Sequence, residues 1–219
     1  MLHKTPGIVF KYFKYGDSSI IVKILTTKFG LQTYIVNGVR SKRSKNKIAL
    51  YQPLTLLDLV VYHNPTKDIN RISEIKCSQP YHSIHENMQK TAMAIFLAEM
   101  LYKCIKDEGE IEDLFNFISS SIVLFDNQES HYQNFHLIFL LKLTKYLGVG
   151  VELSDPAFHS LSTDEVSAIR AFIKQPYDDW VSISNDSRRK ILDLIIRFYK
   201  SHIDSLKEIN SINILKEVL

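Results

Sequence analysis

The sequence predicts a two-domain α+β protein in which a five-stranded OB-type β-barrel is followed by an all-α helical domain. Short β-branched and aromatic runs separated by turn residues fill positions 7–79, whereas apolar residues recur at helical spacing after Pro80. The net charge of the sequence also changes sign at this boundary. Residues 1–80 contain 13 Lys and Arg against 4 Asp and Glu, and residues 81–219 contain 14 against 20. We therefore expect one domain at 1–80 that meets a polyanion and a second domain at 81–219 with a different task.

Five runs in the first domain are predicted strands. They cover residues 7–13, 19–27, 31–39, 54–63 and 69–78. The breaks between them contain turn-forming residues, such as Tyr-Gly-Asp-Ser at 15–18 and His-Asn-Pro-Thr-Lys-Asp at 63–68. A longer excursion, with a short helix at 46–51, separates the third run from the fourth. Five strands in this order are expected of a small, partly open OB-type barrel.

Five longer segments of the second domain are predicted helices. They cover residues 83–105, 110–125, 132–148, 163–174 and 188–203. Gly148 follows the third segment as a helix stop. Ser162 and Glu165 have the spacing of a capping box at the start of the fourth segment. These signals predict a purely helical domain.

The composition is that of an ordinary folded protein, with 45% hydrophobic and 23% charged residues. Its two cysteines, Cys77 and Cys104, are far apart and form no metal-binding pattern, so neither a disulfide framework nor a cysteine zinc site is predicted. No apolar run approaches the roughly 20 residues of a membrane span. The first residues also lack the apolar core of a signal peptide, so we expect a cytoplasmic location.

Patterns typical of catalysis are missing from the sequence, which contains no Gly-rich phosphate loop, GxSxG or HExxH. The acidic run at 106–114 leaves a metal-dependent nuclease as an alternative, although acidic residues are favoured at a helix start in any case. Cleavage of labelled DNA with magnesium or manganese would test that alternative. We expect no enzymatic activity, no cofactor and no metal.

The basic loop is the strongest candidate for a binding site. It is the part of the excursion that places five cations within eight residues, namely Arg40, Lys42, Arg43, Lys45 and Lys47. Small polar residues separate these cations, and no acidic residue is among them. Mobile cations of this kind bind phosphates by releasing counterions. The alternative is a solvated loop that only aids solubility.

Further cations and aromatic rings of the first domain extend this candidate site. They are Lys11, Lys14, Lys23, Tyr15 and Tyr34. Single-strand binders stack bases on such rings while cations follow the backbone. Strand alternation places Tyr12 and Lys14 on one face and Lys11, Phe13 and Tyr15 on the other. Since one face must form the core, some of these rings are structural.

A second basic group lies on the last predicted helix. It consists of Arg188, Arg189, Arg197 and Lys200. This group is a candidate contact for the acidic tail of a partner protein. The alternative is a solvated helix face.

Five short motifs follow one another in the first domain, namely Gly7 to Val9, Tyr15 to Asp17, Thr26 to Gly30, Gly38 to Arg40, and Gln52-Pro53. Taken in this order, they resemble the bacterial DNA repair and recombination mediator family RecO. The resemblance implies an N-terminal OB domain and a helical domain. It also implies binding of single- and double-stranded DNA, strand annealing, and loading of recombinase onto strands coated by single-strand binding protein.

The resemblance further implies two protein partners, RecR and the acidic C-terminal tail of single-strand binding protein, and a nucleoid-associated location during repair. Many family members carry a four-cysteine zinc site after a Leu-Gly junction. Residues 148–160 here contain no cysteine, and Asp155 and His159 alone cannot replace such a site. We therefore predict no structural zinc.

These observations lead to a hypothesis in which the first domain binds DNA phosphates with little dependence on base sequence and strong dependence on salt. The main rival is a protein-interaction scaffold whose barrel binds an acidic partner. Competition by an oligonucleotide would separate the two.

Overall fold

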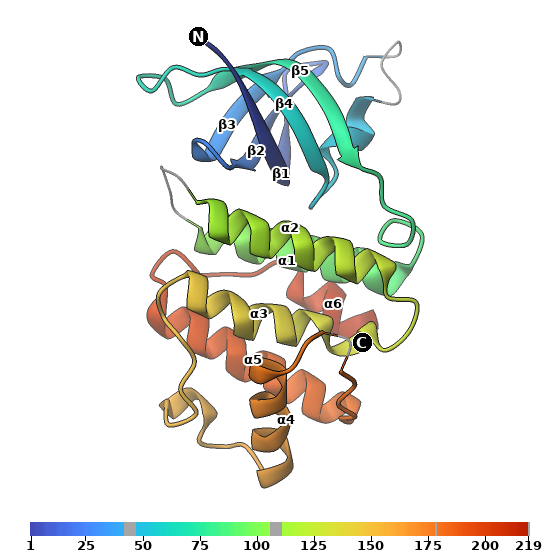
Figure 1. The fold of residues 1–219 in the computed structure, drawn as a ribbon, viewed down its shortest axis with the longest axis vertical. Helices are drawn as coiled ribbons and strands as arrows, with labels where there is room; N and C mark the ends of the chain where they lie inside the picture. Colours follow the sequence, from blue (N-terminus) through green and yellow to red (C-terminus); the bar gives the residue numbers. More distant parts are fainter. Residues whose placement is uncertain (42–46, 106–110, 178, 219) are drawn as a thin grey trace. The chain divides into compact units, whose positions relative to one another are not determined.

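The computed structural model describes residues 1–41, 47–105, 111–177 and 179–218 (Figure 1). The chain forms two compact units. One contains residues 1–82 and 94–122, and the other contains residues 83–93 and 123–219. The five strands belong to the first unit.

The strands of the first unit form a closed barrel. They are β1 (Leu2–Tyr15), β2 (Ser19–Thr26), β3 (Gly30–Val36), β4 (Leu56–Tyr62) and β5 (Asn70–Gln79). Their order around the barrel is β1-β2-β3-β5-β4. Four neighbouring pairs are antiparallel, and the short parallel pair of β3 with β5 closes the ring. The predicted five-stranded barrel is confirmed, and it is closed rather than partly open.

Strand β1 pairs with a different neighbour along each half of its length. Its first half pairs with β4 and its second half with β2, and the register shifts between Val9 and Lys11. Gly7 lies where the two pairings overlap. A Cβ atom there would come within 2.7 Å of Leu59 Cδ1 and 2.8 Å of Ile24 Cγ2. A side chain at this position would therefore force Leu59 or Ile24 to shift, which favours glycine.

The barrel core consists of apolar side chains from every second position of the strands, together with residues of the excursion between β3 and β4. They are Val9, Ile20, Val22, Ile24, Tyr34, Val39, Tyr51, Leu57, Leu59 and Val61. Tyr51 ends the 3₁₀ helix η2 (Lys47–Tyr51), and Val39 follows β3. Both are 2% exposed, so the excursion is pinned to the core on both sides of its undescribed part.

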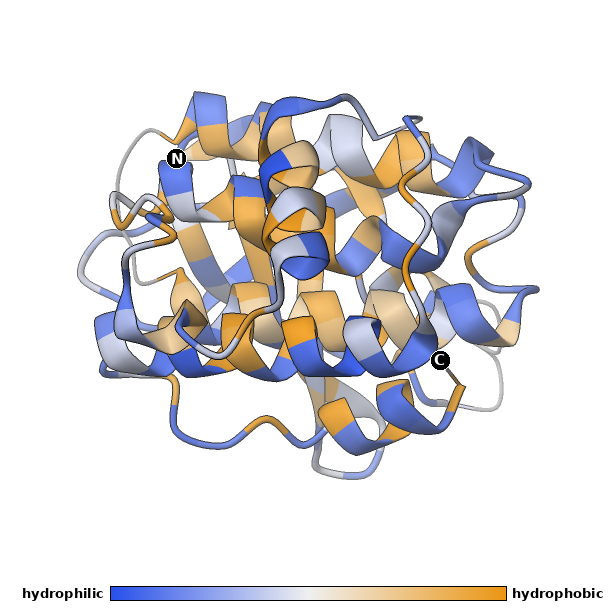
Figure 2. Ribbon diagram, turned by 90° about the horizontal axis from the view of Figure 1, so that it is seen from below, coloured by the Kyte–Doolittle hydropathy of each residue, from blue (hydrophilic) through white to orange (hydrophobic). Residues whose placement is uncertain are grey.

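In the part of the chain that the structure describes, six α-helices follow the barrel. They are α1 (Met88–Cys104), α2 (Glu112–Asn127), α3 (Phe135–Tyr146), α4 (Thr163–Lys174), α5 (Asn185–His202) and α6 (Ile212–Val218). Short 3₁₀ helices precede α3 and α4, namely η3 (Tyr132–Asn134) and η4 (Pro156–Phe158). Hydropathy alternates around the helices, as expected where one side is buried (Figure 2).

The helix signals of the sequence are confirmed where they were specific. Ser162 and Glu165 form the capping box of α4, and Gly148 follows α3 with a φ of 74°. Helix α1 begins five residues later than predicted. In the second unit, Asp126 Oδ1 accepts the backbone N–H groups of Ser83 (2.8 Å) and Ile84 (2.9 Å) before the helix starts. The seven-residue helix α6 was not predicted.

A buried lysine closes the end of α2. Lys90 is 1% exposed, and its ammonium donates to the carbonyl oxygens of Phe125 (2.8 Å), Asp126 (3.1 Å) and Gln128 (2.6 Å). The first two are carbonyls that the helix leaves without intrahelical donors, and Gln128 directly follows its last residue. Ser83 Oγ lies 2.6 Å from the same ammonium, so four acceptors share its three N–H groups. An ammonium group with these hydrogen-bond acceptors can be buried, so we assign Lys90 a structural role.

Candidate nucleic-acid interface

The outer β1–β3 face is a set of outward-pointing side chains on three neighbouring strands. Its first row is Lys11, Lys23 and Thr33, its second row is Phe13, Ile21 and Ile35, and its third row begins with Tyr15 and Ser19. Residues opposite each other in antiparallel strands have Cβ atoms about 5 Å apart. The register therefore gathers two cations and two aromatic rings on one side of the barrel.

The two lysines of this face lie directly opposite each other. Lys23 donates to Thr33 Oγ1 at 2.6 Å, and Lys11 Nζ lies 5.1 Å from the centre of the Phe13 ring. Neither lysine forms an ion pair within the part of the chain that the structure describes. Like charges in this position repel. A bound anion would relieve that repulsion.

The aromatic rings of the face are available for stacking. Phe13 is 40% exposed and Tyr15 is 52% exposed. The alternation predicted from the sequence is confirmed here, because Phe13 and Tyr15 share a face with Lys11. Lys14 pairs with buried Ile20 and therefore belongs to the other set, although its side chain is exposed at the barrel end. Phe13 was not among the predicted site residues, and the alternation was the signal that could have identified it.

Arg40 joins the start of the basic loop to this face. Its backbone N–H donates to Ser18 O (2.9 Å), and its guanidinium donates to Gly16 O (3.1 Å) and more weakly to Ser19 O (3.4 Å). Gly16 and Ser18 lie in the β1–β2 turn after Tyr15, and Ser19 is the first residue of β2. Arg40 is exposed. A guanidinium has five donors, so several remain for a ligand.

Of the other cations in the predicted basic loop, the structure describes only the last. Lys42, Arg43 and Lys45 lie outside the described residues. Lys47 is exposed at the start of η2. Their contribution to binding remains a prediction.

The prediction that Tyr34 contacts DNA is wrong. Its side chain is 0% exposed and belongs to the barrel core, where burial raises the pKa of its hydroxyl group. The hydroxyl group has no hydrogen-bond partner within the described residues. A base cannot reach this ring.

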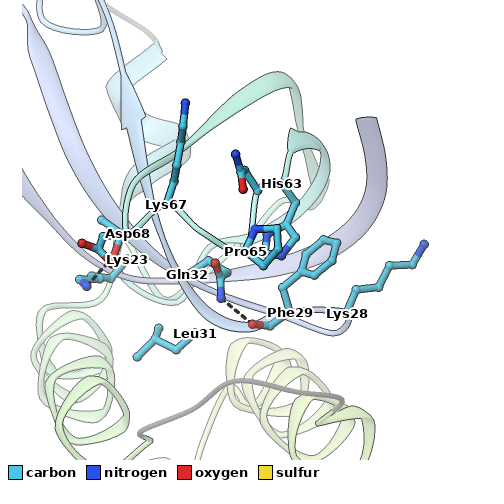
Figure 3. Close-up of a pocket in the computed structure, with 11 residues that line it drawn as sticks. Lys23, Lys28, Phe29, Leu31, Gln32, His63, Pro65, Lys67 and Asp68 are labelled. Atoms are coloured by element: carbon cyan, nitrogen blue, oxygen red, sulfur yellow. Dashed lines mark hydrogen bonds between the residues drawn. The ribbon is translucent and has the colours of Figure 1, made fainter. Parts of the chain in front are cut away.

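A pocket of about 420 Å³ lies at the other end of the face, between the β2–β3 turn and the β4–β5 loop (Figure 3). Lys23 lines it and so belongs both to the pocket and to the first row of the face. The Phe29 and His63 rings in its wall are stacked, with centroids 3.8 Å apart. His3 meets the edge of Phe29 at 5.3 Å. Burial, followed by the nearby His3, lowers the pKa of His63, which favours the uncharged ring.

The barrel surface formed by β4, β5 and the start of β1 has a different charge pattern. Lys4 and Lys76 share a pocket there with Asp58 and Glu74. Asp58 and Lys76 are also register partners. Cations are thus offset by acidic groups on this surface, which makes it an internal control for the outer β1–β3 face.

The basic group on α5 is only partly a surface. Arg188 is 5% exposed and donates through Nε to Asn134 Oδ1 (2.9 Å) and through Nη1 to Asn185 Oδ1. The prediction that it contacts a partner is therefore wrong. Arg189, Arg197 and Lys200 are exposed. Arg189 is 3.9 Å from Asp186 in a weak ion pair.

Asp155 and His159, which the sequence indicates are insufficient for a zinc site, have structural roles after α3. The Asp155 side chain accepts from Ala157 N at 2.8 Å and begins η4, while His159 Nε2 lies 3.1 Å from Ser154 O. Among the described residues, no group of three or more His, Cys, Asp or Glu is arranged to hold a metal ion. Within the same residues, no helix combines the length and the apolar character needed to cross a membrane.

Comparisons with known proteins agree with this architecture. A family model described as recombination protein O N terminal matches residues 1–81, and one described as recombination protein O C terminal matches residues 85–159. The DNA repair protein RecO of Flavobacterium psychrophilum is 33% identical over 234 residues, covering 98% of each chain. The protein of the same name from Bacteroides fragilis is 32% identical over 240 residues, covering 100% of this chain and 99% of its own. That from Christiangramia forsetii is 32% identical over 238 residues with the same coverage. The resemblance seen in the motifs is confirmed, and this chain belongs to the RecO family of DNA repair and recombination proteins.

Proposed function

We propose that this chain is a non-enzymatic mediator of recombination that binds single- and double-stranded DNA through the outer β1–β3 face. The observation that carries this proposal is the opposed pair Lys11 and Lys23 beside the exposed rings of Phe13 and Tyr15. In OB-type barrels the outer face around the second and third strands binds oligonucleotides. Arg40 adds a cation where this face meets the basic loop.

The chemistry of the face suits a single strand without regard to its sequence. Cations contact the backbone, and exposed rings stack on bases, which all present a similar π-face. Each phosphate neutralised on a single strand contributes about 0.7 to the slope of log affinity against log salt concentration. A face that neutralises two strands together would also lower their mutual repulsion and favour annealing.

The remaining functions follow from family membership and are part of the same proposal. They are loading of recombinase onto strands coated by single-strand binding protein, and association with RecR and with the acidic tail of that binding protein. Exposed Arg189, Arg197 and Lys200 are the candidate contacts for an acidic tail. The proposed location is the cytoplasm, with nucleoid association during repair.

The test is a fluorescence-anisotropy titration of a labelled single-stranded oligonucleotide with the full chain across a salt series. The variant Lys11→Ala/Lys23→Ala removes the opposed pair, and Lys4→Ala/Lys76→Ala removes the same charge from the control surface. We expect the first variant to flatten the salt slope by about 1.4, from two lost contacts. The control variant should keep the wild-type slope.

Two outcomes would contradict the proposal. Equal losses in both variants would show that only net charge matters. No binding by the wild type, together with capture of an acidic protein partner, would favour the scaffold function. Far-UV circular dichroism of each variant checks that the fold is intact.

A further inference from the structure

The pocket between the β2–β3 turn and the β4–β5 loop has the size of a ligand site. Its volume of about 420 Å³ falls within the range of about 300–1,000 Å³ that is usual for small-molecule sites. The apolar part of the wall includes Leu31 and Pro65, beside the Phe29–His63 stack. A flat aromatic ligand would find both ring and aliphatic surface there.

Lysine side chains lie on both sides of this pocket, where each side could bind an anion. Lys28 projects on one side in Figure 3, while Lys23 and Asp68 lie on the other and Lys67 extends from the loop above them. Lys28 and Lys67 are exposed. Three lysines and one carboxylate line the pocket. An uncharged His63 adds no further cation.

We infer that this pocket receives one nucleotide of a DNA strand, with the base against the Phe29–His63 wall and the phosphates on either side meeting the flanking lysines. The inference rests on the proposed function, since the strand must first lie on the outer β1–β3 face. Lys23 connects the two, because it is in the first row of that face and in the pocket wall. A DNA strand that lies along this face would therefore reach the pocket while remaining next to lysine side chains.

Charge variants test the phosphate contacts in the full chain. Lys28→Ala/Lys67→Ala should weaken binding of a labelled single-stranded 20-mer roughly 20-fold at about 0.1 M salt, from two lost phosphate contacts. Asp68→Lys should change affinity in the opposite direction. All three side chains are exposed, so the fold should tolerate these changes. Lys4→Ala/Lys76→Ala is the matched control.

Photo-crosslinking tests the position of the base. An oligonucleotide containing 5-iododeoxyuridine is irradiated with the wild type, and the attached peptide is identified by mass spectrometry. We expect attachment at Phe29 or His63 in addition to the outer β1–β3 face. Attachment at Phe13 and Tyr15 alone, or wild-type affinity in Lys28→Ala/Lys67→Ala, would overturn the pocket inference.

These outcomes distinguish failure of the pocket inference from failure of the proposed function. If Lys11→Ala/Lys23→Ala weakens binding while the pocket variants do not, the proposed function stands and the pocket inference is wrong. If the wild type binds no oligonucleotide, both fail.

Discussion

A histidine buried in α3 should make this protein sensitive to mild acid. His136 is 0% exposed, and neither ring nitrogen makes a hydrogen bond of normal geometry within the described residues. Burial, and then the nearby charge of Arg188, lower its pKa from 6.5 to about 3, and a backbone group of Gln133 offsets this only in part. The folded protein therefore holds this ring neutral where an unfolded chain would protonate it.

The sign and size of the effect follow from this difference in pKa. As pH falls below 6.5, the unfolded state binds a proton that the folded state does not, so the stability present above 6.5 is lost until about pH 3. The loss is about 2 kcal/mol at pH 5, and at most about 5 kcal/mol over the whole interval, taking about 1.4 kcal/mol for each unit.

The assay is urea unfolding of the wild type and of His136→Leu at several pH values between about 7.5 and 5. We expect the stability difference between them to shift by about 2 kcal/mol in favour of the variant as pH falls, since leucine cannot be protonated. An unchanged urea dependence would show that both unfold in the same way. If the two stability curves stay parallel, His136 is protonated as easily in the folded protein as in the unfolded chain, and the reasoning is refuted.

Two further substitutions test features of the fold. Lys90→Met leaves the end of α2 without its donors and should lower the free energy of unfolding by about 2–4 kcal/mol. A thermal melt that stays within a degree or two of wild type would show that water replaces the ammonium without loss. Gly7→Ala places a methyl group against Leu59 and Ile24, and should cost about 1–3 kcal/mol by overpacking. Wild-type stability in a urea titration would mean that the strands separate there easily.

The sequence was sufficient for the barrel and most helices because their signals are local. The capping box at Ser162 and the stop at Gly148 need no knowledge of distant residues. The seven-residue helix α6 was missed, since so short a segment has little periodicity to detect.

The errors at the candidate site have a different physical origin. Both faces of β3 contain apolar residues, so periodicity could not decide whether Tyr34 points inward. The direction of the Tyr34 side chain follows from the β2–β3 register, in which Thr33 lies opposite outward-pointing Lys23 and Tyr34 lies opposite buried Val22. Arg188 precedes buried Ile191 and Leu192 by three and four residues, so helical spacing already indicated that it lies on the apolar side of α5. Its partner Asn134, 54 residues away, could not be read from the sequence.

The anchoring of the excursion between β3 and β4 affects how the sequence of this protein can evolve. Val39 and Tyr51 are both held in the barrel core, so the chain between them begins and ends at fixed points. Doubling the length of such a connection costs only about 0.6 kcal/mol in closure entropy. Insertions, deletions or substitutions in the basic loop can therefore change its length and its number of cations during evolution while the barrel core stays the same.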